Sequence, residues 1–217
     1  METNGSHRAE EVIIQAGNRQ LHGYLNVPSP ANGMVAFAHG SASGGNSPRN
    51  QFVAGQLNKG GLATLLLDLL DETEAEDHIN VFDIELLADR LLTAARWLRH
   101  QRQTQDLPLG YFGAGNGAAA ALVAAAQRSS WVKAVVSRGG RPDLASSFLH
   151  QVQAPTLLIV GENDEIVVDL NRDALEALTC AKELAIIPGA THLFPEAGAL
   201  EEVARIAGTW FLRHLIP

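Results

Sequence analysis

The chain has 217 residues, of which 46% are hydrophobic and 18% are charged, and its formal net charge is −8 at pH 7. This composition excludes a disordered chain. An acidic pI near 5.4 without a Lys/Arg cluster disfavours a nucleic-acid partner. No apolar run reaches the roughly 18 residues that span a bilayer, and because the N-terminus is polar we expect no secretory signal there. Because Cys180 is the single cysteine, we expect no internal disulfide, no cysteine-based zinc site and a cytoplasmic location.

Short apolar runs alternate with amphipathic stretches along the whole chain, which is typical of strands and helices in turn. The expected strands cover residues 11–16, 20–27, 34–38, 62–67, 107–112, 132–137, 155–160 and 183–187, and the first two form a hairpin around Gly17-Asn18. The expected helices cover residues 84–98, 118–127, 144–150, 169–178 and 200–215, and the acidic run 71–77 is expected to be a solvated loop.

Continuous apolar strands between helices indicate a mostly parallel sheet that is covered on both faces. We therefore expect an α/β fold in one domain over residues 1–217, with an N-terminal antiparallel hairpin and a flexible start over residues 1–10. Functional side chains of such folds gather in the loops at the carboxyl ends of the strands. We therefore expect the functional site in those loops.

A glycine-rich loop over residues 113–117 follows one strand and opens a helix. Three interpretations fit it: a nucleophile elbow, a dinucleotide-binding turn of the Gly-x-Gly-x-x-Ala kind, or a tight turn packed on the sheet. A dinucleotide turn belongs in the first βαβ unit and needs an acidic residue about 20 positions further on. Here the loop lies mid-chain, and Ser137 and Arg138 stand at that distance, so only an NADP-like ligand stays open.

The loops around the glycine turn favour the elbow. Asp164 comes just after the strand at 155–160, and His192 just after the strand at 183–187. The order elbow, acid, histidine is the chain order of α/β-hydrolase triads. Ser41 follows an earlier strand, where these folds supply one N–H of the oxyanion hole.

These features resemble the α/β-hydrolase superfamily, and within it the small dienelactone-hydrolase-like group without a lid. The resemblance runs from Val12 to Leu215. Its marks besides the elbow are His39-Gly40-Ser41, Ser47-Pro48-Arg49-Asn50, Phe82-Asp83-Ile84-Glu85, Ser137-Arg138-Gly139-Gly140-Arg141-Pro142-Asp143 and Gly189-Ala190-Thr191-His192-Leu193-Phe194. It implies an α/β-hydrolase fold and hydrolysis of an ester or lactone, with a nucleophile–histidine–acid triad and no cofactor.

The chain departs from this family at the residue that matters most. Gly115 stands where the family carries Ser or Cys, and a glycine has no side chain that could attack a carbonyl. Asp164 remains to orient His192, and His192 remains as the base. The oxyanion donors would be the backbone N–H groups of Ser41 and Asn116, which need no particular side chain.

Three explanations of Gly115 stay open at this point. The glycine is a deliberate substitution that traps substrate, or the chain is a natural relative that lost its nucleophile and binds a ligand or partner, or His192 activates a water in the vacated space. Arg49, Arg138 and Arg141 are candidates for meeting an anionic group of the substrate. No spacing of His, Asp and Glu suggests a metal, and we expect a monomer or homodimer acting on a small ester or lactone.

Overall fold

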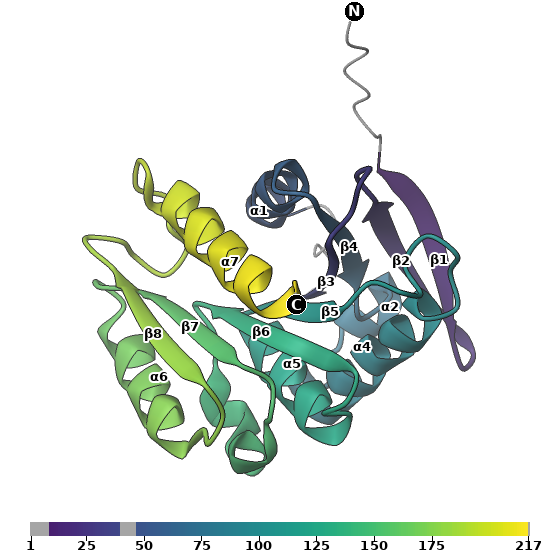
Figure 1. Cartoon of the computed structure of the whole chain (residues 1–217). Coiled ribbons are helices and arrows are strands. Elements are labelled where there is room, and N and C mark those ends of the chain that lie inside the picture. Colours follow the sequence, from purple (N-terminus) through teal and green to yellow (C-terminus); the bar gives the residue numbers. More distant parts are fainter. Residues whose placement is uncertain (1–8, 40–46, 217) are drawn as a thin grey trace, which may run out of the picture.

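A computed structural model describes residues 9–39 and 47–216. Its strands form one eight-stranded sheet in the order β1-β2-β4-β3-β5-β6-β7-β8 (Figure 1). The strands are β1 (Glu10–Ala16), β2 (Arg19–Asn26), β3 (Gly33–His39), β4 (Leu62–Asp68), β5 (Leu109–Ala114), β6 (Val132–Arg138), β7 (Thr156–Gly161) and β8 (Lys182–Ile187). The helices are α1 (Pro48–Lys59), α2 (Glu72–Ala75), α3 (His78–Phe82), α4 (Ile84–Leu98), α5 (Asn116–Gln127), α6 (Glu165–Ala177) and α7 (Ala199–Leu215), with 3-10 turns at Pro142–Ala145 and Leu149–Gln151.

The predicted architecture is confirmed. Strands β1 and β2 form an antiparallel hairpin in which Ala16 pairs with Arg19, and β2 continues antiparallel to β4. All the remaining neighbours, from β4 through β3, β5, β6 and β7 to β8, are parallel. The hairpin therefore lies at one edge of the sheet and β8 at the other (Figure 1).

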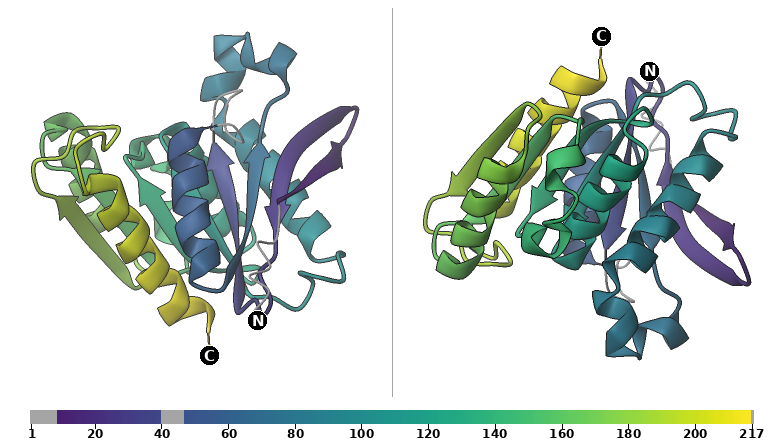
Figure 2. Two further views of the ribbon diagram at one scale, coloured as in Figure 1. Left: turned by 90° about the horizontal axis from the view of Figure 1, so that it is seen from above. Right: turned by 90° about the horizontal axis from the view of Figure 1, so that it is seen from below.

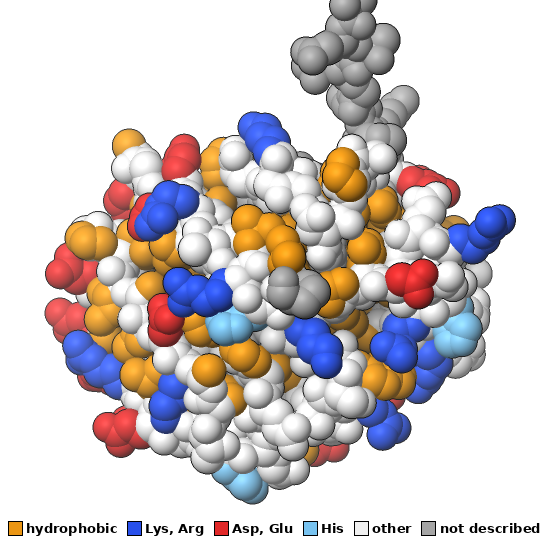
Figure 3. Space-filling view, in the orientation of Figure 1, with side chains coloured by type: hydrophobic (Ala, Val, Ile, Leu, Met, Phe, Trp, Pro, Cys, Tyr) orange, Lys and Arg blue, Asp and Glu red, His pale blue; other side chains and the backbone are white. Residues whose placement is uncertain are grey.

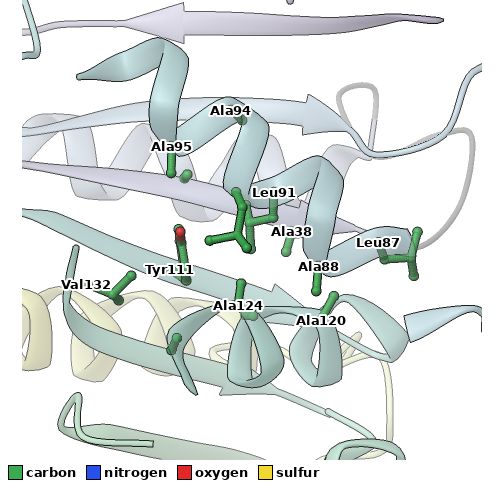
Figure 4. Close-up of a cluster of buried hydrophobic side chains, with 14 of the residues drawn as sticks. Ala38, Leu87, Ala88, Leu91, Ala94, Ala95, Tyr111, Ala120, Ala124 and Val132 are labelled. Atoms are coloured by element: carbon green, nitrogen blue, oxygen red, sulfur yellow. The ribbon is translucent and has the colours of Figure 1, made fainter. Parts of the chain in front are cut away.

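Helices cover both faces of the sheet (Figure 2). Helices α1 and α7 lie on one face, where α7 contributes Trp210 and Phe211 to a buried cluster with Phe37 and Phe112 of the strands. Helices α4, α5 and α6 cover the opposite face. Between α4 and α5 the contact is made by small side chains, among them Ala88 and Ala120 (Figure 4), so the two helices approach each other closely.

Three helices were absent from our expectations: α1, α2 and α3. Helix α1 has few apolar positions, but the parallel pairing of β3 with β4 requires a crossover connection there. The acidic run 71–77 is not the solvated loop that we expected. Asp71 and Glu74 form a capping box that starts α2, and the Glu74 carboxylate pairs with the buried guanidinium of Arg90 at 2.8 Å.

The molecular surface mixes charges of both signs with hydrophobic side chains. On the face drawn in Figure 3, basic groups are interspersed with acidic ones and do not merge into one continuous basic area. Of the helices that the structure describes, none has both the length and the apolar character required to cross a bilayer.

The six parallel strands bring their last residues to one edge of the sheet, which we call the carboxyl edge. These residues are Asp68, His39, Ala114, Arg138, Gly161 and Ile187, in the order of β4, β3, β5, β6, β7 and β8. The loops that carry the residues selected from the sequence begin here. The fold thus gathers segments from across the chain at a single edge.

Candidate active site

The turn from β5 into α5 is an elbow with Gly115 at its apex. Gly115 has φ 55° and ψ −127°, a left-handed conformation that glycine adopts without a Cβ penalty. A Cβ at Gly113 would collide with Ala118, and one at Gly117 with the carbonyl group of Ala38. Small residues on both sides of the apex therefore let the turn lie tightly against the sheet, whereas a Cβ at Gly115 would meet no atom within 4 Å.

His192 and Asp164 form a hydrogen-bonded pair at the carboxyl edge. The distance from His192 Nδ1 to Asp164 Oδ2 is 2.6 Å. Asp164 occupies the N-cap position of α6, yet its side chain makes no capping hydrogen bond and turns to the histidine instead. The side chain of Asp164 is 18% exposed and that of His192 is 49% exposed, so the ring is accessible from solvent. This geometry leaves Nε2 of the imidazole available for chemistry.

The two loops that carry this pair are joined by hydrogen bonds of their own. The carboxylate of Glu162 accepts from the Gly189 N–H at 2.7 Å, and the amide of Asn163 donates to the Gly189 carbonyl at 2.9 Å. Gly161 packs so closely on the second loop that a Cβ there would lie 2.5 Å from the Ala190 carbonyl oxygen. These contacts fix the loop after β7 against the loop after β8, which holds the carboxylate and the imidazole in register.

A pocket of about 220 Å³ lies where these loops meet the elbow. Gly115, Asn116 and His192 line it together with two of the candidate arginines, so the structure brings five of the residues selected from the sequence to one cavity. The side chain of Asn116 donates to the carbonyl of Val81 at 3.0 Å, which ties the elbow to α3. Ser41, the other oxyanion candidate, lies outside the described residues.

The three candidate arginines have different surroundings. Arg49 and Arg138 line the pocket, and no Asp or Glu is among its lining residues. Arg138 is only 6% exposed. Burial, with a smaller effect from the nearby Arg49, lowers the pKa of Arg138 to about 10, so the guanidinium stays charged at neutral pH. Arg141 instead forms two hydrogen bonds to the carboxylate of Asp143, at 2.7 and 2.8 Å, and does not line the pocket.

Val81 and Leu193 also line the pocket, and the sequence did not single them out for this. Val81 belongs to α3, which was not expected, whereas Leu193 directly follows His192 and could have been found from that position. The backbone turns sharply just beyond, since Phe194 has φ 56° while its side chain is buried. Within the described ranges, no three His, Cys, Asp or Glu side chains are grouped so that they could hold a metal ion.

Known proteins resemble this chain in sequence and in structure. Proteins from two strains of Mycobacterium tuberculosis, each named "Putative phosphoribosyl transferase", are 53% identical over 208 residues. The match covers 96% of this chain but 47% of theirs, so the chain spans about half the length of these curated relatives.

The crystal structure of a dienelactone hydrolase from Anabaena variabilis is 54% identical, covers 96% of this chain and 100% of that one, and superimposes with a TM-score of 0.91. An α/β serine hydrolase without lid from Xanthomonas campestris shares the fold, with 22% identity, a TM-score of 0.75 and coverage of 95% of this chain and 94% of its own. The model of the dienelactone hydrolase family matches residues 67–209. The chain belongs to the dienelactone hydrolase family.

Proposed function

We propose that this chain hydrolyses a carboxylic ester or a lactone by direct attack of water, with His192 as the general base. The observation that carries the proposal is the 2.6 Å hydrogen bond between His192 and Asp164, at a pocket that Gly115 also lines. A covalent acyl-enzyme at position 115 is closed, because glycine offers no nucleophilic atom. Water is small enough to occupy the space that a serine side chain would fill.

The proposed reaction needs only groups of this chain and one water molecule. His192 Nε2 takes a proton from the water while the water oxygen bonds to the carbonyl carbon, and the carbonyl electron pair moves onto its oxygen. Backbone N–H groups of Asn116 and Ser41 would stabilise that oxyanion. When the carbonyl re-forms, the carbon–oxygen bond to the leaving group breaks, and the proton on His192 passes to the departing alkoxide. Asp164 keeps Nδ1 protonated and orients the ring.

The rate by this route is expected to be low. In a serine protease, removal of the nucleophile costs about 10⁶-fold, while the oxyanion hole and substrate binding still give about 10³–10⁴-fold over water. An ester with a good leaving group is therefore the substrate on which the activity is most easily seen.

Hydrolysis of a panel of short-chain p-nitrophenyl esters and small lactones tests the proposal. We expect turnover by the wild type above the buffer rate, and its loss in His192→Ala. The matched control is His100→Ala, since His100 is an exposed histidine at the end of α4, bonded to its own helix through the Arg96 carbonyl. Equal rates for wild type and His192→Ala would reject a catalytic role of His192.

A second candidate function is a non-catalytic member of the family that binds a ligand or partner at the same pocket. The absence of a side chain at Gly115 favours it, since the elbow could then serve as part of a binding surface. The same panel separates the two: no turnover on any ester or lactone supports the binding protein.

A further inference from the structure

Two arginine side chains in the pocket have buried nitrogens without a hydrogen-bond partner. Arg138 Nη1 and Arg49 Nε are both inaccessible to solvent, and neither is hydrogen-bonded in the part of the chain that the structure describes. Arg138 is more than nine-tenths buried, and its side chain lines the pocket together with Gly115 and His192. A buried guanidinium without a partner is costly, and natural proteins pair such groups.

The side chains that line the pocket carry a net positive charge. The two guanidinium groups lie close enough for the charge of Arg49 to affect the ionisation of Arg138. The lining residues include no carboxylate, although the chain as a whole carries a net charge of −8. Asp164 engages Nδ1 of His192 rather than either arginine. The lining of this cavity therefore favours an anionic ligand.

The amino end of α5 adds to the same preference. This helix of 12 residues begins at Asn116, and its N-cap Gly115 supplies no side-chain hydrogen bond. The first N–H groups of a helix, together with its dipole, favour an anion at this end. A serine at position 115 would place a hydroxyl in the open space above the helix, but the glycine leaves that space free.

We propose that Arg49, Arg138 and the amino end of α5 form a binding site for a phosphate dianion, either free or as the terminal group of a small phosphomonoester. Two guanidinium groups balance two negative charges, and the planar donors of arginine match phosphate oxygens in pairs. A carboxylate, with one charge, would neutralise only one of the two. The proposal uses the charges of the pocket but not the turnover proposed above, so either can hold without the other.

Isothermal titration in a phosphate-free buffer tests the site directly. Inorganic phosphate and phenyl phosphate are titrated into the wild type, and benzoate serves as the carboxylate reference. We expect both phosphates to bind and benzoate to bind about tenfold more weakly or worse, because its single charge neutralises only one of the two guanidinium groups. Tighter binding of phenyl phosphate would identify a phosphomonoester as the ligand, and equal binding would identify free phosphate; both results support the site.

Two variants locate the binding. Arg49→Gln and Arg138→Met are each expected to weaken phosphate binding by about tenfold or more, while Arg172→Gln leaves it unchanged because Arg172 is exposed and pairs with Asp169 on α6. Circular dichroism verifies that each variant is folded, and Arg49, which is only half-buried, is the safer of the two. The proposal is overturned if the wild type binds no phosphate, if benzoate binds equally well, or if folded Arg49→Gln binds like the wild type.

Discussion

Two pairs of arginines in this molecule have contrasting surroundings. At the corner between the β1–β2 hairpin and α2, Arg19 reaches Asp71 at 2.8 Å, and Arg90 reaches Glu74 at 2.8 Å and the Ala16 carbonyl oxygen at 2.8 Å. At the pocket beside Gly115, Arg49 and Arg138 share no carboxylate among the lining residues.

The presence or absence of a carboxylate partner distinguishes structural arginines from arginines that are available to a ligand. Arg90, whose buried charge is met within the chain, joins α4 to α2 and to the hairpin turn, and removal of one partner of such a buried pair is destabilising. A buried arginine whose charge is unmet lowers stability until a ligand supplies the counter-charge. Burial alone would have grouped Arg90, at 8% exposed, with Arg138, at 6%. Their partners distinguish them.

The largest expected effect comes from restoring a nucleophile at the pocket. Gly115→Ser is expected to raise ester hydrolysis by about 10²-fold or more, because His192, which is paired with Asp164, lines the same pocket as residue 115. The same change is expected to lower the free energy of unfolding by about 1–2 kcal/mol, since a serine must adopt φ near 55°. Ester assays and urea unfolding measure the two effects.

Gly17→Ser is the matched control for that variant. Gly17 has φ 63°, and a Cβ there would also meet no atom within 4 Å, but it lies in the hairpin turn. It should show a similar loss of stability with no gain in activity. A folded Gly115→Ser protein without ester or lactone turnover would shift the account to the binding protein.

A smaller effect, on stability alone, is expected at the paired corner. Arg90→Met removes the closer and more buried of the two cations that pair with Glu74, and leaves this carboxylate, which is 10% exposed, with Arg19 at 3.6 Å. We expect the free energy of unfolding to fall by about 3 kcal/mol, as measured by urea unfolding. Arg172→Met, which breaks an exposed pair on α6, should cost less than about 1 kcal/mol. Equal losses of unfolding free energy in the two variants would show that the buried arginine pair matters no more to stability than the exposed one.

The same kind of substitution at the pocket should not substantially lower the free energy of unfolding. Arg138→Met replaces a buried cation that lacks a carboxylate partner with an apolar side chain of similar length. In a buffer without multivalent anions, we expect the unfolding free energy to change by less than about 1 kcal/mol, or to rise. A loss as large as that of Arg90→Met would mean that Arg138 is already satisfied within the protein.

The smallest expected effect concerns a histidine far from both regions. Burial, followed by the charge of Arg213, lowers the pKa of His214 in the folded protein, while Glu183 opposes the shift. In the unfolded chain this histidine has a pKa of about 6.5 and takes up its proton at a higher pH than in the folded protein. The free energy of unfolding therefore falls as the pH drops through the unfolded pKa toward the lower folded one. His214→Gln should flatten this part of the profile of unfolding free energy against pH. An unchanged slope would show that His214 is not its source.

The sequence predicted the sheet, the hairpin and most helices because their apolar periodicity is strong and continuous. Asp164 and His192 were selected for a different reason, since both stand just after strands that end at the carboxyl edge, and the structure shows that they are hydrogen-bonded. Helix α1 was missed because its apolar positions are sparse. Helix α2 was missed because its acidic residues, two of which form a capping box, were interpreted as a solvated loop. Arg141 pairs with Asp143, whereas no carboxylate lines the pocket beside Arg138. This difference depends on side-chain directions, which the spacing of residues in the sequence does not specify.

We propose that His192 activates water at a site where no covalent intermediate can form at residue 115. Mass spectrometry of the intact protein, quenched during turnover of a p-nitrophenyl ester, tests this most directly. We predict nitrophenol release that depends on His192, with the protein mass unchanged, whereas Gly115→Ser should accumulate an acylated species. An acyl adduct on the wild-type protein, or release that is equal in His192→Ala, would contradict the account.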